Sequence, residues 1–248
     1  MANIHSFESL AALDGEGIRY AVFFTRCPLR CVYCHNPDTW HAGEIEMSAA
    51  ELFDKIKRYK PYFKNGGGVT FSGGEPLLSS RFINETCRLL KTENIGYCID
   101  TSGSVKLDDE VKTALLNADM VILDIKFHNE ADYKKYTGGD FSLPAEIGKF
   151  CSDNRKRLML RSVIIPGIND SESDIKGYAD YVKNLGLRFE KYELLAFHTM
   201  GFFKYDELGI DNPLKDTPPL DKEKLNALQD LLNSRLNGEK YVSDRQTD

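Results

Sequence analysis

The sequence lacks the long apolar runs and the blocks of like charge that mark membrane proteins and nucleic-acid-binding proteins. Its start, MANIHSFESL, has no extended apolar stretch and no cationic flank, so we expect no secretory signal and no membrane span. Acidic and basic residues are interspersed and the formal net charge is −6, which argues against a nucleic-acid surface. We therefore expect a cytoplasmic, monomeric protein in a reducing compartment, without a nucleic-acid or membrane partner.

Cysteine is scarce, and its distribution excludes a dense disulfide framework. The cysteines that stand far apart are Cys87, Cys98 and Cys151. The others, Cys27, Cys31 and Cys34, lie in the stretch TRCPLRCVYCHN with Cys-x3-Cys-x2-Cys spacing. A zinc site usually takes four ligands in two separated pairs, and here only His35 follows. Two interpretations stay open: a small zinc site completed by His35, or thiolates that hold an iron–sulfur cluster with one iron left open.

Short apolar runs alternate along the chain with amphipathic stretches of helical length. The runs cover residues 18–24, 68–72, 96–100, 119–126, 157–165 and 190–197. Such alternation is typical of parallel strands joined by right-handed helical crossovers. Six strands are too few for a closed eight-stranded barrel, and a chain of 248 residues with 42% apolar content can form one core. We predict an α/β fold with an open or partial barrel as a single domain, residues 1–248.

Capping signals predict where several helices begin and end. Ser48 and Glu51 have the spacing of a capping box at the start of a first helix. Residues 171–185 have one apolar face and are followed by a glycine, and a last helix begins near residue 221. The polar tail, residues 237–248, is expected to fray.

Polar side chains follow the predicted strands at the edge where a barrel of this kind carries its chemistry. In chain order they are the cysteine cluster, Gly73-Gly74-Glu75, Asp100-Thr101, Asp124-Ile125-Lys126, Arg161 and His198. Each alone has an ordinary explanation, such as a tight turn at the glycines or a structural ion pair of Asp124 with Lys126. Asp124 closes an apolar run, where an unpaired carboxylate costs roughly several kcal/mol, and this favours a bound cation or ligand. Their joint placement predicts a ligand site.

The cysteine spacing, with Tyr33 before the last cysteine, resembles the signature of the radical S-adenosylmethionine (SAM) enzymes, and Gly73-Gly74-Glu75 resembles their methionine-binding motif. Further stretches extend the resemblance along nearly the whole chain to the activating enzymes of pyruvate formate-lyase: IHSFES, DGEGIR, CVYCHNPDTW, GGGVTFSGGEP, LDIK and LLAFH. That family has a partial (β/α)6 barrel, an open TIM-like core. No cysteine lies between His35 and Val69, so the ferredoxin-like insert of many other glycyl radical enzyme activases is absent.

The resemblance implies both the cofactors and the reaction. The three cysteine thiolates would bind three irons of a [4Fe-4S] cluster, and SAM would bind the fourth. Reductive cleavage of SAM would release a 5′-deoxyadenosyl radical, which takes a hydrogen from a glycine in a loop of pyruvate formate-lyase. The electron would come from a donor such as flavodoxin or ferredoxin. The alternatives are an activase of another glycyl radical enzyme, a small-molecule radical enzyme, or a zinc-stabilised binding module.

The same resemblance assigns the site residues to groups. Those expected to contact SAM are Tyr33, Cys34, His35, Gly73, Gly74, Glu75, Asp124, Ile125, Lys126 and His198. Those expected to hold a monovalent cation, K⁺ or Na⁺, are Asp100, Thr101 and Asp124. Asp14 and Arg161 would dock the partner, with residues 1–16 near the docking edge. The chain departs from the family at Glu16, where proline is usual, and at Thr199-Met200, which bears on docking and not on the chemistry.

Overall fold

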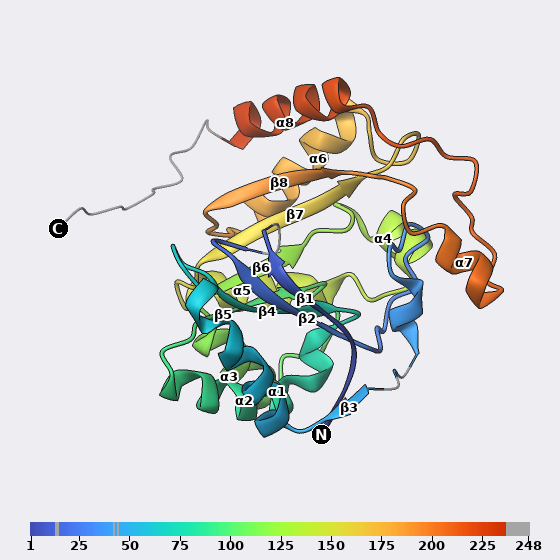
Figure 1. Cartoon of the computed structure of the whole chain (residues 1–248). Coiled ribbons are helices and arrows are strands. Elements are labelled where there is room, and N and C mark those ends of the chain that lie inside the picture. Colours follow the sequence, from blue (N-terminus) through green and yellow to red (C-terminus); the bar gives the residue numbers. More distant parts are fainter. Residues whose placement is uncertain (13–14, 42, 44, 237–248) are drawn as a thin grey trace.

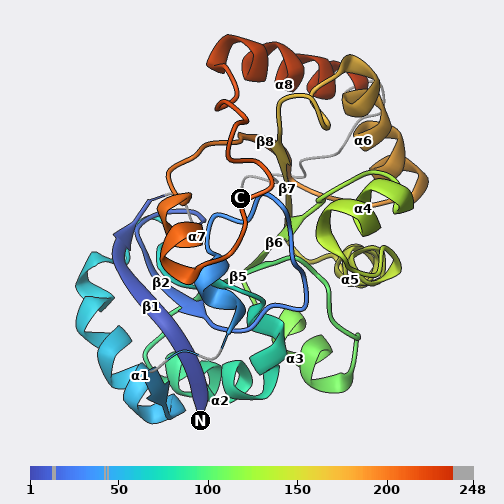
Figure 2. The same cartoon turned by 90° about the vertical axis from the view of Figure 1, so that its right-hand side faces the viewer.

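The structure is a computed structural model that describes residues 1–12, 15–41, 43 and 45–236. Asp14 and the tail, residues 237–248, lie outside the described residues, so the expectations for both remain predictions. One sheet forms the centre of the described chain, with the strand order β3-β1-β2-β4-β5-β6-β7-β8. Figures 1 and 2 show this sheet curling without closing, with the large helices along its outer side. The predicted open α/β barrel is confirmed.

The six predicted strands are all present and pair in parallel. They are β2 (Arg19–Phe24), β4 (Gly68–Gly73), β5 (Tyr97–Thr101), β6 (Met120–Asp124), β7 (Leu158–Ile164) and β8 (Lys191–Ala196). Because they are parallel, their carboxyl ends meet at one edge of the sheet, as the sequence analysis assumed.

Two antiparallel strands were not predicted. The strands are β1 (Ala2–Ala11) and β3 (Ile45–Met47), and β1 pairs with both β2 and β3. The segment expected only to lie near a docking edge therefore begins as a long strand that extends the sheet beyond β2. Its residues ANIHSFESLA mix polar and apolar side chains without regular alternation, which is why no strand was predicted there.

The helices α1 to α6 precede or connect the parallel strands β4 to β8, and α7 and α8 follow the last strand. They are α1 (Ala49–Ile56), α2 (Ser80–Thr92), α3 (Asp109–Asn117), α4 (Glu130–Thr137), α5 (Ser142–Asp153), α6 (Glu172–Asn184), α7 (Phe203–Leu208) and α8 (Lys222–Leu236). Short 3-10 turns are η1 (Pro37–Trp40), η2 (Lys57–Tyr62) and η3 (Pro76–Ser79). Among the described residues, no helix has the length and apolar character needed to cross a membrane.

The sheet separates two layers of side chains. On its outer face Val121 and Leu123 of β6 join the main core with residues of the helices, including Ile147 and Cys151 of α5. On the inner face of β6 the side chains change from apolar to polar along the strand. The inner positions after Met120 are Ile122 and then Asp124. Along this strand the barrel interior is thus apolar at the amino end and polar at the carboxyl end.

The predicted capping box of α1 is present. The hydroxyl of Ser48 accepts from the amide of Glu51 at 3.3 Å, and the carboxylate of Glu51 accepts from the amide of Ser48 at 2.8 Å. Ser171 and Asp174 form the same arrangement at α6. These reciprocal bonds satisfy amide groups that a helix start leaves without a partner.

We predict that Ser48→Ala lowers the free energy of unfolding by about 1 kcal/mol, because the amide of Glu51 loses its acceptor. Urea unfolding under anaerobic conditions, followed by circular dichroism, measures the change. Ser79→Ala is the matched control, since Ser79 is the N-cap residue of α2 but makes no side-chain capping bond. Equal losses in both variants would show that the capping bonds of Ser48 do not stabilise α1.

Candidate active site

A loop of residues 25–36, here called the cysteine loop, follows β2 across the carboxyl ends of the strands. Backbone hydrogen bonds hold the loop along its length. The amide of Arg26 donates to the carbonyl of Thr39 at 2.6 Å. The amides of Arg30 and Val32 donate to the carbonyls of Thr137 and Tyr136 in α4 at 2.8 and 3.0 Å. Leu29 is buried among side chains from the loops after β6 and β7. The loop is therefore anchored on the barrel before any ligand binds.

The three cysteines of this loop line one cavity of about 230 Å³ at the carboxyl ends of the strands. The predicted site residues that share this lining are Cys27, Cys31, Tyr33, Cys34, His35, Gly73, Gly74, Asp100, Thr101, Asp124 and Lys126. They come from the cysteine loop and from the ends of β4, β5 and β6. Residues separated by up to about a hundred positions are thus brought to one place, as the strand-end argument expected.

The three thiols are reduced and largely withdrawn from solvent. Burial raises the pKa of Cys27 to about 11 and that of Cys31 to about 12, and it also raises the pKa of Cys34. The positive charge of Lys126 acts in the opposite direction on each of them. Thiols bind metal as thiolates, so a cationic metal group is what would compensate their charge in this cavity.

A compact site for one metal ion is not what the described residues form. Among them, no three His, Cys, Asp or Glu side chains converge as a single ion requires. A zinc ion holds its ligands at about 2.0–2.3 Å from one centre. His35 does not complete such a set with the cysteines; its ring instead lies 4.7 Å from the ring of His198, edge to face.

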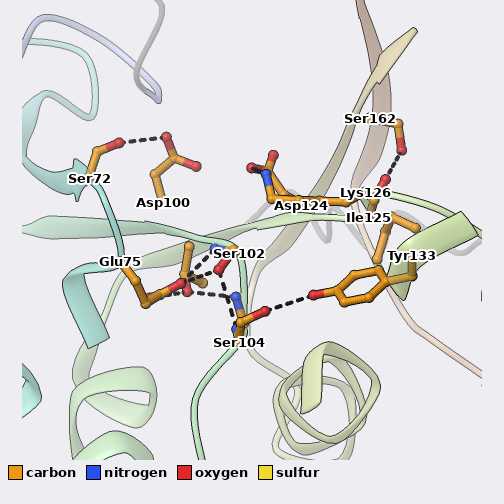
Figure 3. A network of polar contacts seen from close by, with 12 residues as sticks. Ser72, Glu75, Asp100, Ser102, Ser104, Asp124, Ile125, Lys126, Tyr133 and Ser162 are labelled. Atoms are coloured by element: carbon orange, nitrogen blue, oxygen red, sulfur yellow. Dashed lines mark hydrogen bonds and ion pairs between the residues drawn. The ribbon is translucent and has the colours of Figure 1, made fainter. Parts of the chain in front are cut away.

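Lys126 and Asp124 form an ion pair with 2.8 Å between Nζ and Oδ2, and Figure 3 shows the two side chains lying together. Burial opposes the charge of Lys126, but Asp124, Tyr33 and Cys31 together hold its pKa well above the usual value. The Nζ atom also lies 5.9 Å from the ring centroid of Tyr33. The pair is the ion pair considered from the sequence, and it lines the cavity, so its charges act on whatever binds there.

Tyr33 supplies a polar group that its own chain does not satisfy. Its hydroxyl is buried and has no hydrogen-bond partner among the described residues. Buried polar atoms without partners are rare in proteins and call for an explanation. Because Tyr33 lines the cavity between two of the cysteines, a polar ligand there is a suitable partner.

Glu75 was expected to contact SAM, but its side chain points away from the cavity. Its carboxylate is fully buried, does not line the cavity, and accepts from four donors (Figure 3). They are the Leu77 amide at 3.1 Å, the Thr101 hydroxyl at 2.6 Å, and the amide and hydroxyl of Ser102 at 3.0 and 2.5 Å. Burial raises the pKa of Glu75, and these bonds counteract it. The carboxylate ties the loop after β4 to the end of β5, and it uses the Thr101 hydroxyl that was expected to bind a cation.

Gly73 and Gly74 allow the turn after β4 to approach the backbone of Phe24 and Arg26 closely. Gly73 has φ +103°, and an added Cβ would lie 2.4 Å from the Phe24 amide nitrogen. An added Cβ at Gly74 would lie 2.3 Å from the carbonyl oxygen of Arg26. Only glycine permits this approach, so the turn packs directly on the cysteine loop and also faces the cavity.

The remaining predicted residues divide between the cavity and other places. Asp100 lines the cavity and accepts from the hydroxyl of Ser72 at 2.9 Å. Ile125 is buried in the main core, and its carbonyl accepts from Ser162 (Figure 3). Arg161 pairs with Glu193 at 3.3 Å and borders a second cavity of about 310 Å³, away from the cysteines. The docking role of Arg161 remains a prediction.

The sequence analysis did not predict that the segment between β8 and α8 contacts the cysteine loop. The hydroxyl of Tyr205 donates to the carbonyl of Cys34 at 2.9 Å, and Lys204 lies 2.7 Å from Asn36 and 2.9 Å from Asp38. Gly201 packs against His35, where a Cβ would lie 2.3 Å from the carbonyl oxygen. Only the helical spacing of residues 203–208 signalled this segment, and that spacing says nothing about its contacts.

Comparison with known proteins agrees with this geometry. The model of the Radical SAM superfamily matches residues 21–179, from β2 into α6. The chain therefore belongs to the radical SAM superfamily.

Within that superfamily, the chain is 43% identical over 238 residues to a pyruvate formate-lyase-activating enzyme of Clostridium pasteurianum, across 95% of this chain and 99% of the relative. It is 36% identical over 242 residues to the enzyme of that name from Staphylococcus epidermidis, across 93% and 95% of the two chains. The resemblance to this family is confirmed. A solved radical SAM methyltransferase from Sphaerobacter thermophilus matches with a TM-score of 0.66 at 16% identity, across 95% of this chain and 75% of that one, and supports the fold alone.

Membership decides the question that the cysteine spacing left open. Enzymes of this family use a [4Fe-4S] cluster and SAM, so those expected cofactors are confirmed and the zinc-stabilised binding module is set aside. The donor set fits the cluster, because the cavity offers three thiols and leaves one iron without a cysteine.

We predict that Glu75→Gln destabilises the protein by about 2 kcal/mol or more, because the new amide group turns hydrogens toward donors that need an acceptor. Thermal unfolding followed by circular dichroism measures the change. Glu85→Gln is the control, since Glu85 forms only an exposed pair with Arg81 and its loss should change the melting temperature little. If the two variants melt alike, the Glu75 network does not support the fold as described.

Proposed function

We propose that this protein activates pyruvate formate-lyase by forming a glycyl radical on it. The observation that carries the proposal is the convergence of three cysteines with polar strand-end residues on one cavity, in a chain 43% identical to an enzyme of that name. When bound, the cluster would supply the electron for reductive cleavage of SAM, the chemistry by which a hydrogen atom would be taken from the target glycine. Glycine is a suitable target because it has no side chain to block the approach.

Cys27, Cys31 and Cys34 would hold the cluster. Backbone amides of their loop donate to the carbonyls of Thr39 and of Thr137 in α4, so the ligands are positioned in advance. SAM would bind beside the cluster in the same cavity. This assignment accounts for a cysteine cluster without a fourth protein ligand.

The remaining cavity residues would bind and orient SAM. The Gly73-Gly74 turn offers backbone groups without side chains, and the Lys126–Asp124 pair offers one charge of each sign beside the thiols. The unpartnered hydroxyl of Tyr33 would donate to or accept from the ligand. His35, whose ring lies against that of His198, also lines the cavity. Glu75 would act by positioning the strand ends and not by contact. These residues orient the cofactor and exclude water; none is assigned acid–base chemistry.

We predict that anaerobically prepared protein contains iron and sulfide in near-equal amounts and forms a glycyl radical on pyruvate formate-lyase, measured by electron paramagnetic resonance. Cys27→Ser, Cys31→Ser and Cys34→Ser should each abolish SAM cleavage, because each removes a proposed cluster ligand.

Cys87→Ser and Cys151→Ser are the matched controls. These cysteines are buried in α2 and α5 and do not line the cavity, so the cluster spectrum should remain. Stoichiometric zinc, with full activity after iron chelation, would contradict the ligand assignment. A radical formed on a different glycyl radical protein, and not on pyruvate formate-lyase, would keep the chemistry but change the partner.

The monovalent cation proposed beside Asp100 and Asp124 has its own test. Both carboxylates line the cavity, and Lys126 already pairs with one of them. Positive charge near Asp100 would reduce the repulsion between them. We predict tighter SAM binding to the cluster-loaded protein in K⁺ or Na⁺ than in a bulky organic cation at equal ionic strength, measured by calorimetry. Equal dissociation constants would exclude a bound ion.

A further inference from the structure

Trp40 is the only tryptophan of the chain, and the proposed function gives it no role. It is the last residue of η1 and is half-buried. Its side chain lines the same cavity as the three cysteines of the cysteine loop. A tryptophan side chain combines a large apolar ring with a single hydrogen-bond donor, the indole N–H group. The partner of that donor decides whether Trp40 only packs beside the cavity or also acts on what binds there.

The backbone between Cys34 and Trp40 folds back on the cysteine loop. The amide and the hydroxyl of Thr39 both donate to the carbonyl of Asn36, at 3.0 and 2.7 Å. The carbonyl of Thr39 accepts from the amide of Arg26 at 2.6 Å, near the start of the cysteine loop. These hydrogen bonds hold η1 against the cysteine loop, so the position of Trp40 beside the thiols is set by the backbone on both sides of it.

The ring of Trp40 is held in one orientation by two neighbours. The guanidinium of Arg30 lies 5.1 Å from the ring centroid and also donates to two carbonyls of the cysteine loop. The ring of Tyr205 lies edge to face, with 6.2 Å between centroids and an interplanar angle of 88°. Tyr205 belongs to α7, which lies beside η1 (Figure 2). The indole is therefore oriented before any ligand binds, which is what a directional hydrogen bond requires.

The donor of Trp40 is directed at a proposed cluster ligand. Its indole hydrogen-bonds to the thiol group of Cys34, and because the indole N–H can only donate, the sulfur is the acceptor. The backbone amide of Asn36 donates to the same sulfur. Burial raises the pKa of Cys34, whereas these two donors and the charge of Lys126 act in the opposite direction. Trp40 thus stabilises negative charge on Cys34.

A hydrogen bond to a ligand sulfur affects the two redox states of an iron–sulfur cluster unequally. The reduced state carries one more negative charge, and part of that charge lies on the sulfur atoms. An N–H donor therefore stabilises the reduced state more than the oxidised state, and hydrogen bonds to the sulfurs are among the factors that set the reduction potentials of such clusters. The effect is larger inside a protein than in water, because the local dielectric constant is lower.

We propose that Trp40, by donating its indole Nε1–H to the Sγ atom of Cys34, raises the reduction potential of the [4Fe-4S] cluster that Cys34 would ligate. The inference rests on the proposed function and deepens it, because reduction of the cluster has to precede the cleavage of SAM. Trp40 is a positioning residue in this scheme, since it acts through Cys34 and touches neither the irons nor the target glycine. No bond breaks and no proton is transferred.

The test replaces the N–H group and leaves the ring. Because the chain has a single tryptophan, incorporating 3-benzothienylalanine in place of tryptophan changes Trp40 alone and puts a sulfur atom where the N–H group was. A redox titration of the cluster-loaded protein without SAM, followed by electron paramagnetic resonance of the reduced cluster, gives the midpoint potential. At the wild-type midpoint, we predict that the ratio of reduced to oxidised cluster falls about fivefold, as expected for the loss of one hydrogen bond to a charged group.

Two controls separate the hydrogen bond from packing. Protein with 5-fluorotryptophan at position 40 keeps the N–H group and should titrate at the wild-type potential or slightly above it. Tyr205→Phe removes a hydrogen bond of 2.9 Å to the carbonyl of Cys34, not to its sulfur. This variant should melt at a lower temperature but keep a midpoint potential close to that of the wild type.

A spectroscopic signature tests the contact directly. In the reduced wild-type cluster, electron–nuclear double resonance should detect an exchangeable proton coupling that disappears in D₂O and is absent from the benzothienylalanine protein. Trp40→Phe, which removes the N–H group by an encoded substitution, should lose the same coupling and shift the potential in the same direction.

The outcomes separate this inference from the function on which it rests. If the benzothienylalanine protein titrates like the wild type, or if the 5-fluorotryptophan protein shifts as far as it does, Trp40 only packs beside Cys34 and the inference is wrong. If Tyr205→Phe shifts the potential equally, the position of the loop and not the N–H···S bond sets it. If the wild-type protein holds no reducible cluster, the proposed function fails instead.

Discussion

Glu75 is a buried residue that joins three of the strand ends lining the cavity, those of β2, β4 and β5. Its amide donates to the carbonyl of Arg26 after β2, and its carboxylate accepts from Thr101 and Ser102 after β5. A buried carboxylate is costly unless donors surround it, and here four do. The network continues from Ser102 through Ser104 to Tyr133 of α4, whose helix also holds the cysteine loop. The thiols and the glycine turn therefore share one support.

The Lys126–Asp124 pair provides the second constraint, which is electrostatic. Burial raises the pKa of the thiols, whereas metal binding needs thiolates. Lys126 favours the charged form of each thiol, and Asp124 helps to keep Lys126 charged despite its burial. The structural ion pair weighed from the sequence thus lines the cavity in which the ligand is proposed to bind. The free-energy cost of burying the two charges is offset because each faces the other and both line the cavity.

The sequence predicted the parallel strands and the site's location because both depend on local patterns. Apolar runs with helical spacing between them identify a parallel sheet, and parallel strands bring their carboxyl ends together. The direction of a side chain at such an end depends on contacts from distant segments. Glu75 turns inward because Thr101 and Ser102 offer donors, and no local pattern contains that information. Tyr205 is a second example, because its hydrogen bond to Cys34 spans 171 positions in the sequence. The strand β1 is a third, because its pairing with β2 stabilises it although its residues do not alternate regularly.

At the end of the barrel opposite the cavity, ion pairs link strands that do not all pair with one another. Among the described strands β3 and β8 are the edges, so no strand pairing closes the ring. Arg157, at the start of β7, instead pairs with Glu16 before β2 at 2.8 Å and with Glu190 before β8 at 2.7 Å. Single exposed pairs contribute little, but one arginine that binds two carboxylates by several hydrogen bonds is a better-defined link. Glu16, where the family usually has proline, is therefore part of a clasp at the amino ends of the strands. The barrel is linked there by charge, whereas its carboxyl end carries the cavity.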